Sequence, residues 1–270
     1  MEWPEYCITN LEHSKKMYQK YMKKTWDFKN PTTFTEKLWW LSVYDNSFLK
    51  TFCADKITLH DYSTDKLGRD ICIPLLGTYD SANQIDFTKL PNRFVIKCNH
   101  GSGWNIIVKD KSKLNIADAR AKLNTWLRRK WSEHEYHYHL IPPKILVEEY
   151  KDNLDDIKFF CFNGIPKFCQ VDKHFQEHRM NFYDCEWNYL PDISNLAYPS
   201  NPNIKDKKPE QLNEMIGIAK QLSKDFKFVR VDLYPTESGI MLGELTFIPG
   251  GGIISYKNDG DMKIGQMLDL

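Results

Sequence analysis

Residues 228–252 read FVRVDLYPTESGIMLGELTFIPGGG, and this stretch decides the fold. Two largely apolar runs flank a polar turn, which predicts an antiparallel hairpin that runs into a cluster of glycines. Successive side chains of a strand point to opposite faces, so alternate residues of each run share a face. A turn centred on Ser238 sets Asp232 opposite Glu244 and Arg230 opposite Thr246.

This predicted pairing has a chemical consequence, because two carboxylates that face each other across a sheet repel unless a cation lies between them. An oxygen-rich pair such as Asp232 and Glu244 suits Mg²⁺ held together with nucleotide phosphates. Arg230 beside them suits a phosphate or a developing oxyanion. The alternative interpretation is a solvated hairpin with ordinary surface charges.

A second glycine-rich segment lies earlier in the chain, at KCNHGSG, residues 97–103. It follows the apolar run RFVI and precedes another, NIIV, which predicts a hairpin with a glycine-rich tip. Glycines let successive backbone N–H groups turn toward one point, and such a nest beside the Lys97 ammonium suits phosphate oxygens. The alternative is a tip that needs glycine for its backbone shape alone. The motif is neither GxxxxGK[ST] nor GxGxxG.

The remaining pattern predicts helices, then strands, then a helix, strands, a helix and strands. Apolar spacing predicts two helices within 11–44, with a capping box from Thr33 to Glu36, and Asn163-Gly164 is a favoured hairpin turn. Pro209 stands at a plausible first position of a helix that runs to about residue 226. This order indicates an α+β fold with antiparallel sheets.

Composition bounds the function. The 270 residues, 31.9 kDa, suffice for one large or two ordinary domains. Lys and Arg number 37 against 36 Asp and Glu, so the net charge of +1 gives no indication of a nucleic-acid partner.

We expect no membrane-spanning segment, because no apolar run approaches 18–20 residues. Residues 1–16 lack the pattern of a secretory signal, and the seven scattered cysteines contain no CxxC, so we expect a cytoplasmic protein.

Three weaker signals remain. His134, His137 and His139 have spacings that suit a transition metal, but we interpret their tract, HEYHYH, mainly as a surface loop. Cys98 beside Lys97 is a candidate for a thiol of depressed pKa, although adjacency alone does not make a nucleophile. The acidic run Glu148-Glu149-Tyr150 is more often a solvated strand end than a site.

Taken together, these pieces resemble the ATP-grasp superfamily, and most closely its TupA-like branch, which is associated with teichuronopeptide, capsule and related surface-polysaccharide synthesis. The resemblance covers most of the chain. Its motifs here are NPTTFTEKLWWL, ADK at 54–56, LPNRFVIKCNHGSG, VEEY at 147–150, DIKFFCFNG, MNFYDCEW, FVRVDLY and GELTFIPGGG.

The resemblance implies that two α+β subdomains with antiparallel sheets clamp Mg-ATP. The implied division is a helical segment at 1–50, an N-terminal subdomain at 51–145 and a C-terminal subdomain at 146–270. Lys56 and Lys97 match the two lysines that reach the phosphates in the family. The residues that match the glycine-rich turn over the triphosphate are Gly101, Ser102 and Gly103.

Further roles follow from the same resemblance. Glu148, Glu149 and Tyr150 occupy the strand that holds adenine and ribose, with the choice between the two glutamates left open. Lys158 resembles the basic residue at which related ligases meet a nucleotide or acyl phosphate. In the last hairpin, the resemblance implies that Arg230 stabilises the oxyanion. It also implies that Asp232, Glu244 and Thr246 are Mg²⁺ ligands. Thr246 stands where many relatives have Asn, so one or two Mg²⁺ ions remain open.

The implied activity is that of an ADP-forming carboxylate–amine ligase that makes an amide through an acyl phosphate. The implied carboxylate is a uronic acid of a capsular or other surface polysaccharide, or its nucleotide-sugar precursor, and the partner is a small amine. The rival is a glycosyltransferase or sugar kinase of the same pathway, for which Asp259-Gly260-Asp261 and Asp155-Asp156 are the available acidic pairs. A binding module that keeps the ATP clamp as a scaffold is the third alternative, and the oligomeric state is left open.

Overall fold

The computed structural model describes residues 9–152, 154–173 and 179–270. The expectation for the secretory signal rests partly on residues 1–8, which lie outside this part. The helices are α1 Leu11–Met22, α2 Phe34–Tyr44, α3 Phe48–Ala54, α4 Leu59–Leu67, α5 Ile116–Leu127, α6 Leu212–Ser223 and α7 Gly260–Gly265. The strands are β1 Leu75–Tyr79, β2 Phe94–Cys98, β3 Asn105–Val108, β4 Ile145–Glu149, β5 Asp156–Phe162, β6 Ile165–Lys173, β7 Arg179–Asp184, β8 Phe228–Thr236 and β9 Gly239–Thr246.

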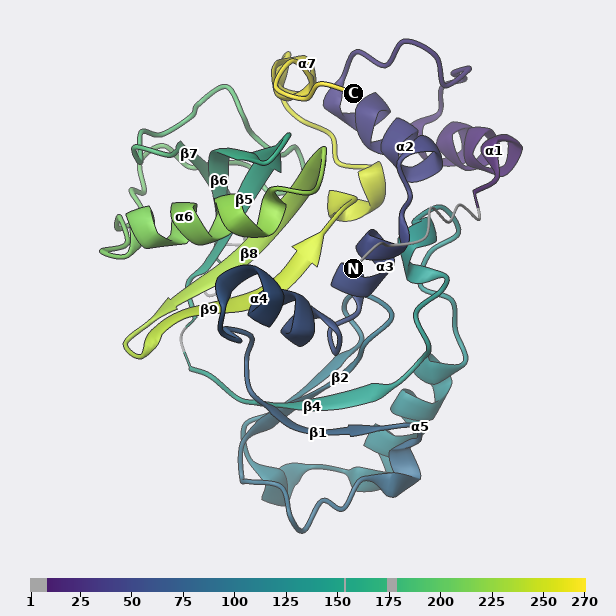
Figure 1. The fold of residues 1–270 in the computed structure, drawn as a ribbon, viewed down its shortest axis with the longest axis vertical. Helices are drawn as coiled ribbons and strands as arrows, with labels where there is room; N and C mark the ends of the chain where they lie inside the picture. Colours follow the sequence, from purple (N-terminus) through teal and green to yellow (C-terminus); the bar gives the residue numbers. More distant parts are fainter. Residues whose placement is uncertain (1–8, 153, 174–178) are drawn as a thin grey trace.

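These strands form two antiparallel sheets, as the sequence predicts. The smaller sheet has the order β1-β4-β2-β3, and the larger has the order β7-β6-β5-β8-β9. Figure 1 shows them as separate layers, with the four-stranded sheet below and the five-stranded sheet above. The α+β architecture with a short helical segment before it is therefore confirmed.

Local sequence signals account for several element ends. Thr33 caps α2, and the Glu36 carboxylate accepts a hydrogen bond from the Thr33 backbone N–H, which completes the predicted capping box. Asn163 and Gly164 both have positive φ, 48° and 77°, as a tight hairpin turn between β5 and β6 requires. Gly68 ends α4 in the left-handed region.

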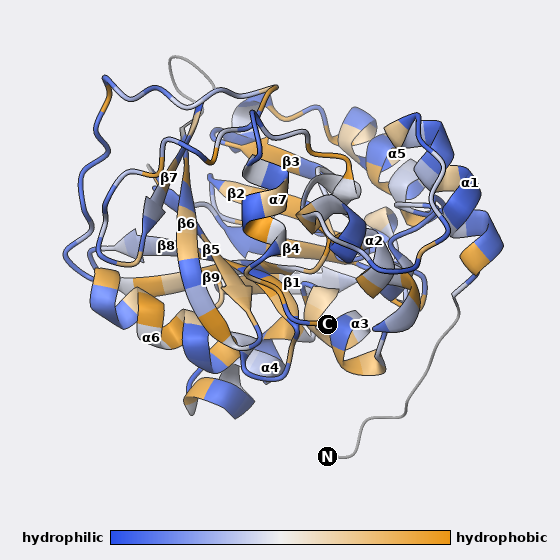
Figure 2. Ribbon diagram, turned by 90° about the horizontal axis from the view of Figure 1, so that it is seen from above, coloured by the Kyte–Doolittle hydropathy of each residue, from blue (hydrophilic) through white to orange (hydrophobic). Residues whose placement is uncertain are grey.

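Each sheet packs on its own apolar core. Phenylalanines dominate beneath the larger sheet, where Phe160 stacks on Phe168 with ring centroids 4.6 Å apart. Helix α6 covers this sheet with its apolar side, and its residues alternate between hydrophobic and hydrophilic in Figure 2. The smaller sheet packs on α5 through residues such as Leu123 and Phe94, both fully buried. The cavity described below lies where these two layers meet.

The passage from one sheet to the other follows β4. Strand β4 pairs with both β1 and β2, so it belongs to the smaller sheet. The division at 145/146 that the resemblance implies falls inside β4. We therefore propose a boundary near residue 150, in the segment that leads to β5.

Two local expectations are wrong. Pro209 is not the first residue of α6, because the helix begins at Leu212 after Gln211, and the intervening residues form a turn. The tract at 134–139 is not a surface loop, since His134, Glu135 and His137 are all buried. A short 3₁₀ turn at Tyr136–Tyr138 carries this tract between the N-terminal helices and the end of β9.

Within the described ranges, none of the helices is both long enough and apolar enough to cross a membrane.

Candidate active site

A cavity of about 420 Å³ opens between the two sheets, at the place where the predicted residues converge. The residues that line it are Lys56, Lys97, Gly101, Ser102, Gly103, Trp104, Asn105, Asp156, Lys158, Tyr234, Gly243 and Glu244. Seven of these are predicted site residues, and they come from segments as far apart as residues 56 and 244. The chain thus gathers three lysines and a glycine-rich turn around one space.

The two lysines matched to the phosphates are held in place by different partners. The Lys56 ammonium donates to the backbone carbonyl of Gly101 at 2.5 Å, on the glycine-rich turn itself. Lys97 on β2 forms an ion pair with Glu148 on β4, with 2.5 Å between Nζ and Oε2. Burial lowers the pKa of Lys56, outweighing nearby Glu244. An anion bound in the cavity would favour the charged form of Lys56.

The β8–β9 hairpin has the predicted register at its functional end. Asp232 faces Glu244, and Arg230 faces Thr246. Beyond Asp232 a bulge shifts the pairing by one residue, so that Leu233 faces Leu242 and the turn is centred between Glu237 and Ser238. The predicted pairing is therefore confirmed for these four residues, and it differs from the prediction only beyond the bulge, at the tip.

The cation between the facing carboxylates is the Arg230 side chain. Its Nε and Nη2 atoms each donate to Asp232 at 2.7 Å, which is a bidentate pair. The same Nη2 lies 3.1 Å from Glu244 Oε1 and 3.1 Å from Thr246 Oγ1. Lys158 adds a second cation, whose Nζ lies 2.9 Å from Asp232 Oδ2, the oxygen that also accepts from Arg230 Nη2.

These cations set the protonation of the site. Burial raises the pKa of Glu244, but Arg230, Lys56 and Lys158 outweigh it and lower that pKa to about 2. Burial also opposes the charge on Lys158, yet Asp232 and Asp156 raise its pKa above the ordinary value. Glu244 is therefore an anion and Lys158 a cation throughout the neutral range.

The donor set around the cavity fits a hard divalent cation. Asp156 contacts Lys158 through one oxygen, whereas its buried Oδ1 has no hydrogen-bond partner among the described residues. Glu244 lines the same space as a carboxylate. Two carboxylates in the wall of one cavity match the ligands that Mg²⁺ prefers. Asp232, in contrast, already gives both oxygens to Arg230 and Lys158.

Some predicted site residues lie beside the cavity and not in its wall. Glu149 pairs with Lys151 at 2.7 Å, and the guanidinium of Arg93 lies over the Tyr150 ring at 4.4 Å. Asp232 is fully buried behind Arg230. Thr246 donates to Glu244 at 3.1 Å and so orients that carboxylate.

Four residues of the cavity wall were not among the predicted site residues: Trp104, Asn105, Tyr234 and Gly243. Tyr234 continues the alternation that places Arg230 and Asp232 on one face, and that signal was available. A Cβ at Gly243 would lie only 2.5 Å from the Tyr234 ring, which explains a glycine there. Asn105 begins β3 and Trp104 precedes it, and neither has such a signal.

Two rival signals do not survive in the described structure. Cys98 is buried, and burial raises the pKa of its thiol to about 12, so it is not an activated nucleophile. Asp261, of the acidic pair at 259 and 261, accepts hydrogen bonds from the backbone N–H and hydroxyl of Thr35 at 2.9 and 3.0 Å. It therefore anchors the start of α2 to the last helix.

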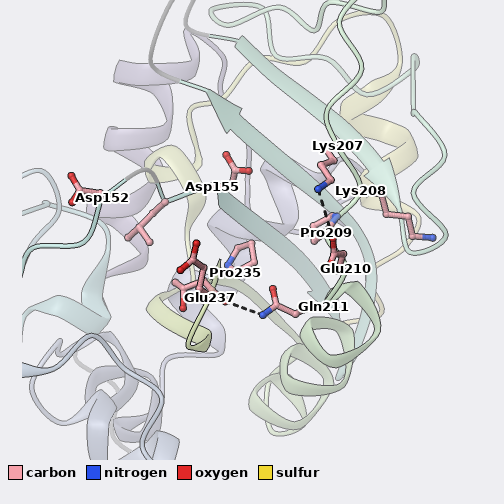
Figure 3. A pocket seen from close by; sticks show the side chains of 11 residues that line it. Asp152, Asp155, Lys207, Lys208, Pro209, Glu210, Gln211, Pro235 and Glu237 are labelled. Atoms are coloured by element: carbon pink, nitrogen blue, oxygen red, sulfur yellow. Dashed lines mark hydrogen bonds and ion pairs between the residues drawn. The ribbon is translucent and has the colours of Figure 1, made fainter.

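A larger groove of about 730 Å³ lies outside this site. Figure 3 shows its lining side chains, which come from the segment before β5, the turn before α6 and the tip of the β8–β9 hairpin. Charges of both signs occur there, with Lys207 and Glu210 paired at 3.7 Å and both highly exposed. Asp155 and Pro235 in this groove neighbour Asp156 and Tyr234 in the cavity, so the two hollows flank the ends of β5 and β8.

Comparison with known proteins identifies the family. The model of the TupA-like ATP-grasp family matches residues 36–269. No curated protein matches the chain. Similar solved structures include D-alanine–D-alanine ligase from Bacillus anthracis in complex with ATP, with 16% identity and a TM-score of 0.44 over 74% of this chain and 55% of that one.

Two further structures show similar values. D-alanine–D-alanine ligase from Helicobacter pylori is 17% identical, with a TM-score of 0.45 over 81% of this chain and 62% of that one. L-amino acid ligase from Bacillus licheniformis is 13% identical, with a TM-score of 0.47 over 74% of this chain and 44% of that one. The chain thus spans less than two thirds of the length of these three proteins. The family match covers nearly the whole chain, and the protein belongs to the TupA-like ATP-grasp family.

Proposed function

We propose that this protein is an ATP-dependent, ADP-forming carboxylate–amine ligase. The observation that supports this most is the cavity between the two sheets, where Lys56, Lys97 and Lys158 face the Glu244 carboxylate beside a glycine-rich turn. Three cations around one carboxylate suit a polyphosphate with a bound divalent cation. The family match supports the same ligand, Mg-ATP.

In the proposed reaction, a carboxylate oxygen of the substrate attacks the γ-phosphorus of ATP, and ADP leaves. Lys56 and Lys97 bind phosphate oxygens, so Lys97 exchanges its contact with Glu148 for the nucleotide. Glu244 and Asp156 would hold Mg²⁺, which would neutralise charge on the transferring phosphoryl group. Asp232 and Thr246, the other ligands that the resemblance implies, would have to give up their contacts with Arg230 and Glu244 to reach the ion. No covalent enzyme intermediate is needed, because positioning and electrostatics carry this step.

The second step is attack of an amine on the acyl phosphate, which releases phosphate and forms an amide. The developing oxyanion needs a fixed positive group, and Arg230 supplies one that Asp232 already orients through two hydrogen bonds. Lys158, buried beside it, keeps its charge for the same purpose. Glu148, Glu149 and Tyr150 stand at the end of β4 as the proposed contacts to the nucleoside.

The substrates follow from the TupA-like resemblance. We propose a uronic acid of a capsular or other surface polysaccharide, or its nucleotide-sugar precursor, as the carboxylate. A small amine, such as an amino acid or amino alcohol, is the proposed acceptor. Because the reaction consumes ATP, we place it in the cytoplasm.

Hydroxylamine trapping tests this function. The protein is incubated with Mg-ATP, hydroxylamine and a panel of glucuronic and galacturonic acids and their UDP derivatives, and hydroxamate and ADP are measured together. Equal amounts of ADP and hydroxamate are the expected result. Transfer of sugar from a UDP-sugar without ATP would contradict the ligase and establish the glycosyltransferase alternative, whereas ADP with a phosphorylated sugar and no hydroxamate would establish a sugar kinase.

A further inference from the structure

Glu135 is a buried carboxylate that the proposed reaction does not yet use. Only 7% of the residue is exposed. It stands at the start of the 3₁₀ turn Tyr136–Tyr138, but its side chain makes no capping hydrogen bond. Its hydrogen-bonding neighbours are neutral: the Trp131 indole donates to Oε1 at 3.2 Å, and the Ser132 hydroxyl lies beside it. Within the described part of the chain, no ion pair compensates this carboxylate.

The position of Glu135 connects it with the candidate active site from two sides. Trp131 packs edge-to-face on Trp104, with ring centroids 5.4 Å apart, and Trp104 is a wall of the cavity. On the other side, Glu135 Oε1 lies 3.7 Å from the point where a Cβ of Gly251 would stand. Gly251 belongs to the turn that directly follows the Glu244 and Thr246 strand.

The turn beside this carboxylate is built from three glycines. Gly250, Gly251 and Gly252 have consecutive positive φ of 57°, 63° and 68°, a conformation that glycine adopts without strain. The His134 imidazole donates to the Gly251 carbonyl at 2.7 Å and so fixes the turn against the Glu135 segment. Gly250 is exposed and Gly251 half-buried, so this side of Glu135 is close to solvent.

We propose that Glu135 receives the ammonium group of the amine substrate and takes its proton before the attack on the acyl phosphate. This inference rests on the proposed ligase function. A carboxylate without a cation, walled by an indole and a glycine turn, is complementary to a small ammonium ion. Arg230 and Lys158 pair with Asp232, and Lys56 donates to the Gly101 carbonyl, so in the described structure none of these three cations pairs with Glu135.

Glu135 and the leaving phosphate together accept the two protons that the ammonium group loses. The ammonium gives one proton to the Glu135 carboxylate, which frees the nitrogen lone pair. The C–N bond then forms and the bond from the carbonyl carbon to the phosphate oxygen breaks. The phosphate leaves with that electron pair and takes the second amine proton as hydrogen phosphate. Neutral amide, neutral Glu135 and hydrogen phosphate result, and solvent restores the carboxylate.

The pKa of Glu135 suits a proton acceptor. Burial, together with the negative charge of Glu244, raises the pKa of Glu135 to about 7. A base with a pKa near the working pH is the most effective proton acceptor. The ionisable neighbours on its own segment, His134 and Tyr138, are buried and neutral at this pH, since burial lowers the pKa of His134 and raises that of Tyr138.

The experiment compares two nucleophiles in wild type, Glu135→Gln, Glu135→Asp and the control Glu133→Gln, whose exposed side chain is two residues away. Hydroxylamine is largely uncharged at neutral pH and needs no base, whereas ethanolamine and L-alanine are ammonium ions. We expect Glu135→Gln to lose amide formation about 100-fold more than it loses hydroxamate formation. Glu135→Asp should recover part of that rate. Equal loss of both products, or of neither, would overturn the proposal.

A binding measurement keeps the test independent of turnover. The carboxyl carbon of Glu135, assigned by its absence in Glu135→Gln, is followed by NMR in ¹³C-glutamate-labelled protein with methylamine, ethanolamine and L-alanine. We expect an ammonium ion to lower the pKa of Glu135, because the opposite charge favours the anion. No response to any of the three overturns the proposal, even if hydroxamate forms. Absence of hydroxamate with a normal amine response would instead contradict the ligase function.

Discussion

The Nη2 atom of Arg230 lies 3.1 Å from Oε1 of Glu244, on the strand that faces its own. This contact places a guanidinium between Glu244 and Asp232, two carboxylates that would otherwise repel each other in a buried setting. Arg230 therefore has a structural as well as a proposed catalytic role. The same side chain links the two strands of the hairpin and contacts Glu244, which lines the cavity.

Removal of the Arg230 charge is expected to destabilise the protein strongly. In Arg230→Met, Asp232 remains fully buried with Lys158 as its one strong cation. Breaking a buried pair in this way costs about 3–5 kcal/mol in the free energy of unfolding. Urea denaturation measures this cost, and Arg69→Met is the control, because its pair with Glu214 is exposed and worth at most about 1 kcal/mol.

A second variant separates charge from packing. Arg230→Met combined with Asp232→Asn removes the uncompensated charge, so it is expected to be more stable than Arg230→Met alone. If the double variant is the less stable of the two, the ion pair is not the source of the cost.

Affinity for Mg-ATP is expected to fall as pH rises through the alkaline range. Burial lowers the pKa of Lys56, so this lysine loses its proton at a lower pH than an exposed lysine does. The neutral amine binds phosphate less strongly than the ammonium ion. Titration calorimetry between about pH 7 and pH 10 tests this in wild type and Lys56→Arg, whose charge persists over that range. Equal pH dependence in the two proteins would contradict the assignment.

Buried imidazoles are expected to make the fold sensitive to mild acid. His137 is buried, and its Nε2 has no hydrogen-bond partner among the residues that the structure describes. Burial, with smaller effects from Lys50, His139 and His134, lowers the pKa of His137 well below the ordinary value. The unfolded chain therefore binds a proton near pH 6.5 that the folded chain does not bind. The contribution of neutral His137 to the free energy of unfolding is fully present above that pH. It falls as the pH drops toward the pKa of His137 in the folded protein.

His137→Phe tests this sign directly, because phenylalanine fits beside Phe247 and cannot titrate. Urea denaturation at about pH 7.5 and about pH 5.5 should show that the free energy of unfolding falls less between these pH values in the variant than in wild type. The control is His60→Phe, since that ring is paired with an exposed Asp70. A larger acid loss in His137→Phe would contradict the assignment.

The hairpin chemistry was open to prediction because it depends on local rules. Strand alternation and a short turn fix which residues face each other, and the pairing of Asp232 with Glu244 follows from them. The bulge after Asp232 depends on the fit of the hairpin to neighbouring strands, so local rules do not reveal it. The helix caps at Thr33 and Gly68 are local in the same sense.

The burial of the 134–139 tract was not open to prediction. The lack of Cys partners and the two prolines that follow the tract favoured a surface loop. The structure buries the tract because elements distant in sequence cover it: Trp39 stacks on His134 with ring centroids 4.3 Å apart, and Phe247 packs on His137. The gathering of Trp104 and Lys56 in one cavity is equally a property of the tertiary fold.

The most direct test of the proposed nucleotide site is the change in melting temperature on addition of Mg-ATP, compared among wild type, Glu244→Gln and Glu237→Gln. Glu237 lies in the separate groove and serves as the control. At about 100 times its Kd, Mg-ATP should stabilise wild type and Glu237→Gln by about 2.7 kcal/mol, or several degrees. Glu244→Gln should show little or no shift. Full stabilisation of Glu244→Gln, or a shift with UDP-sugars and none with Mg-ATP, would contradict the proposed site.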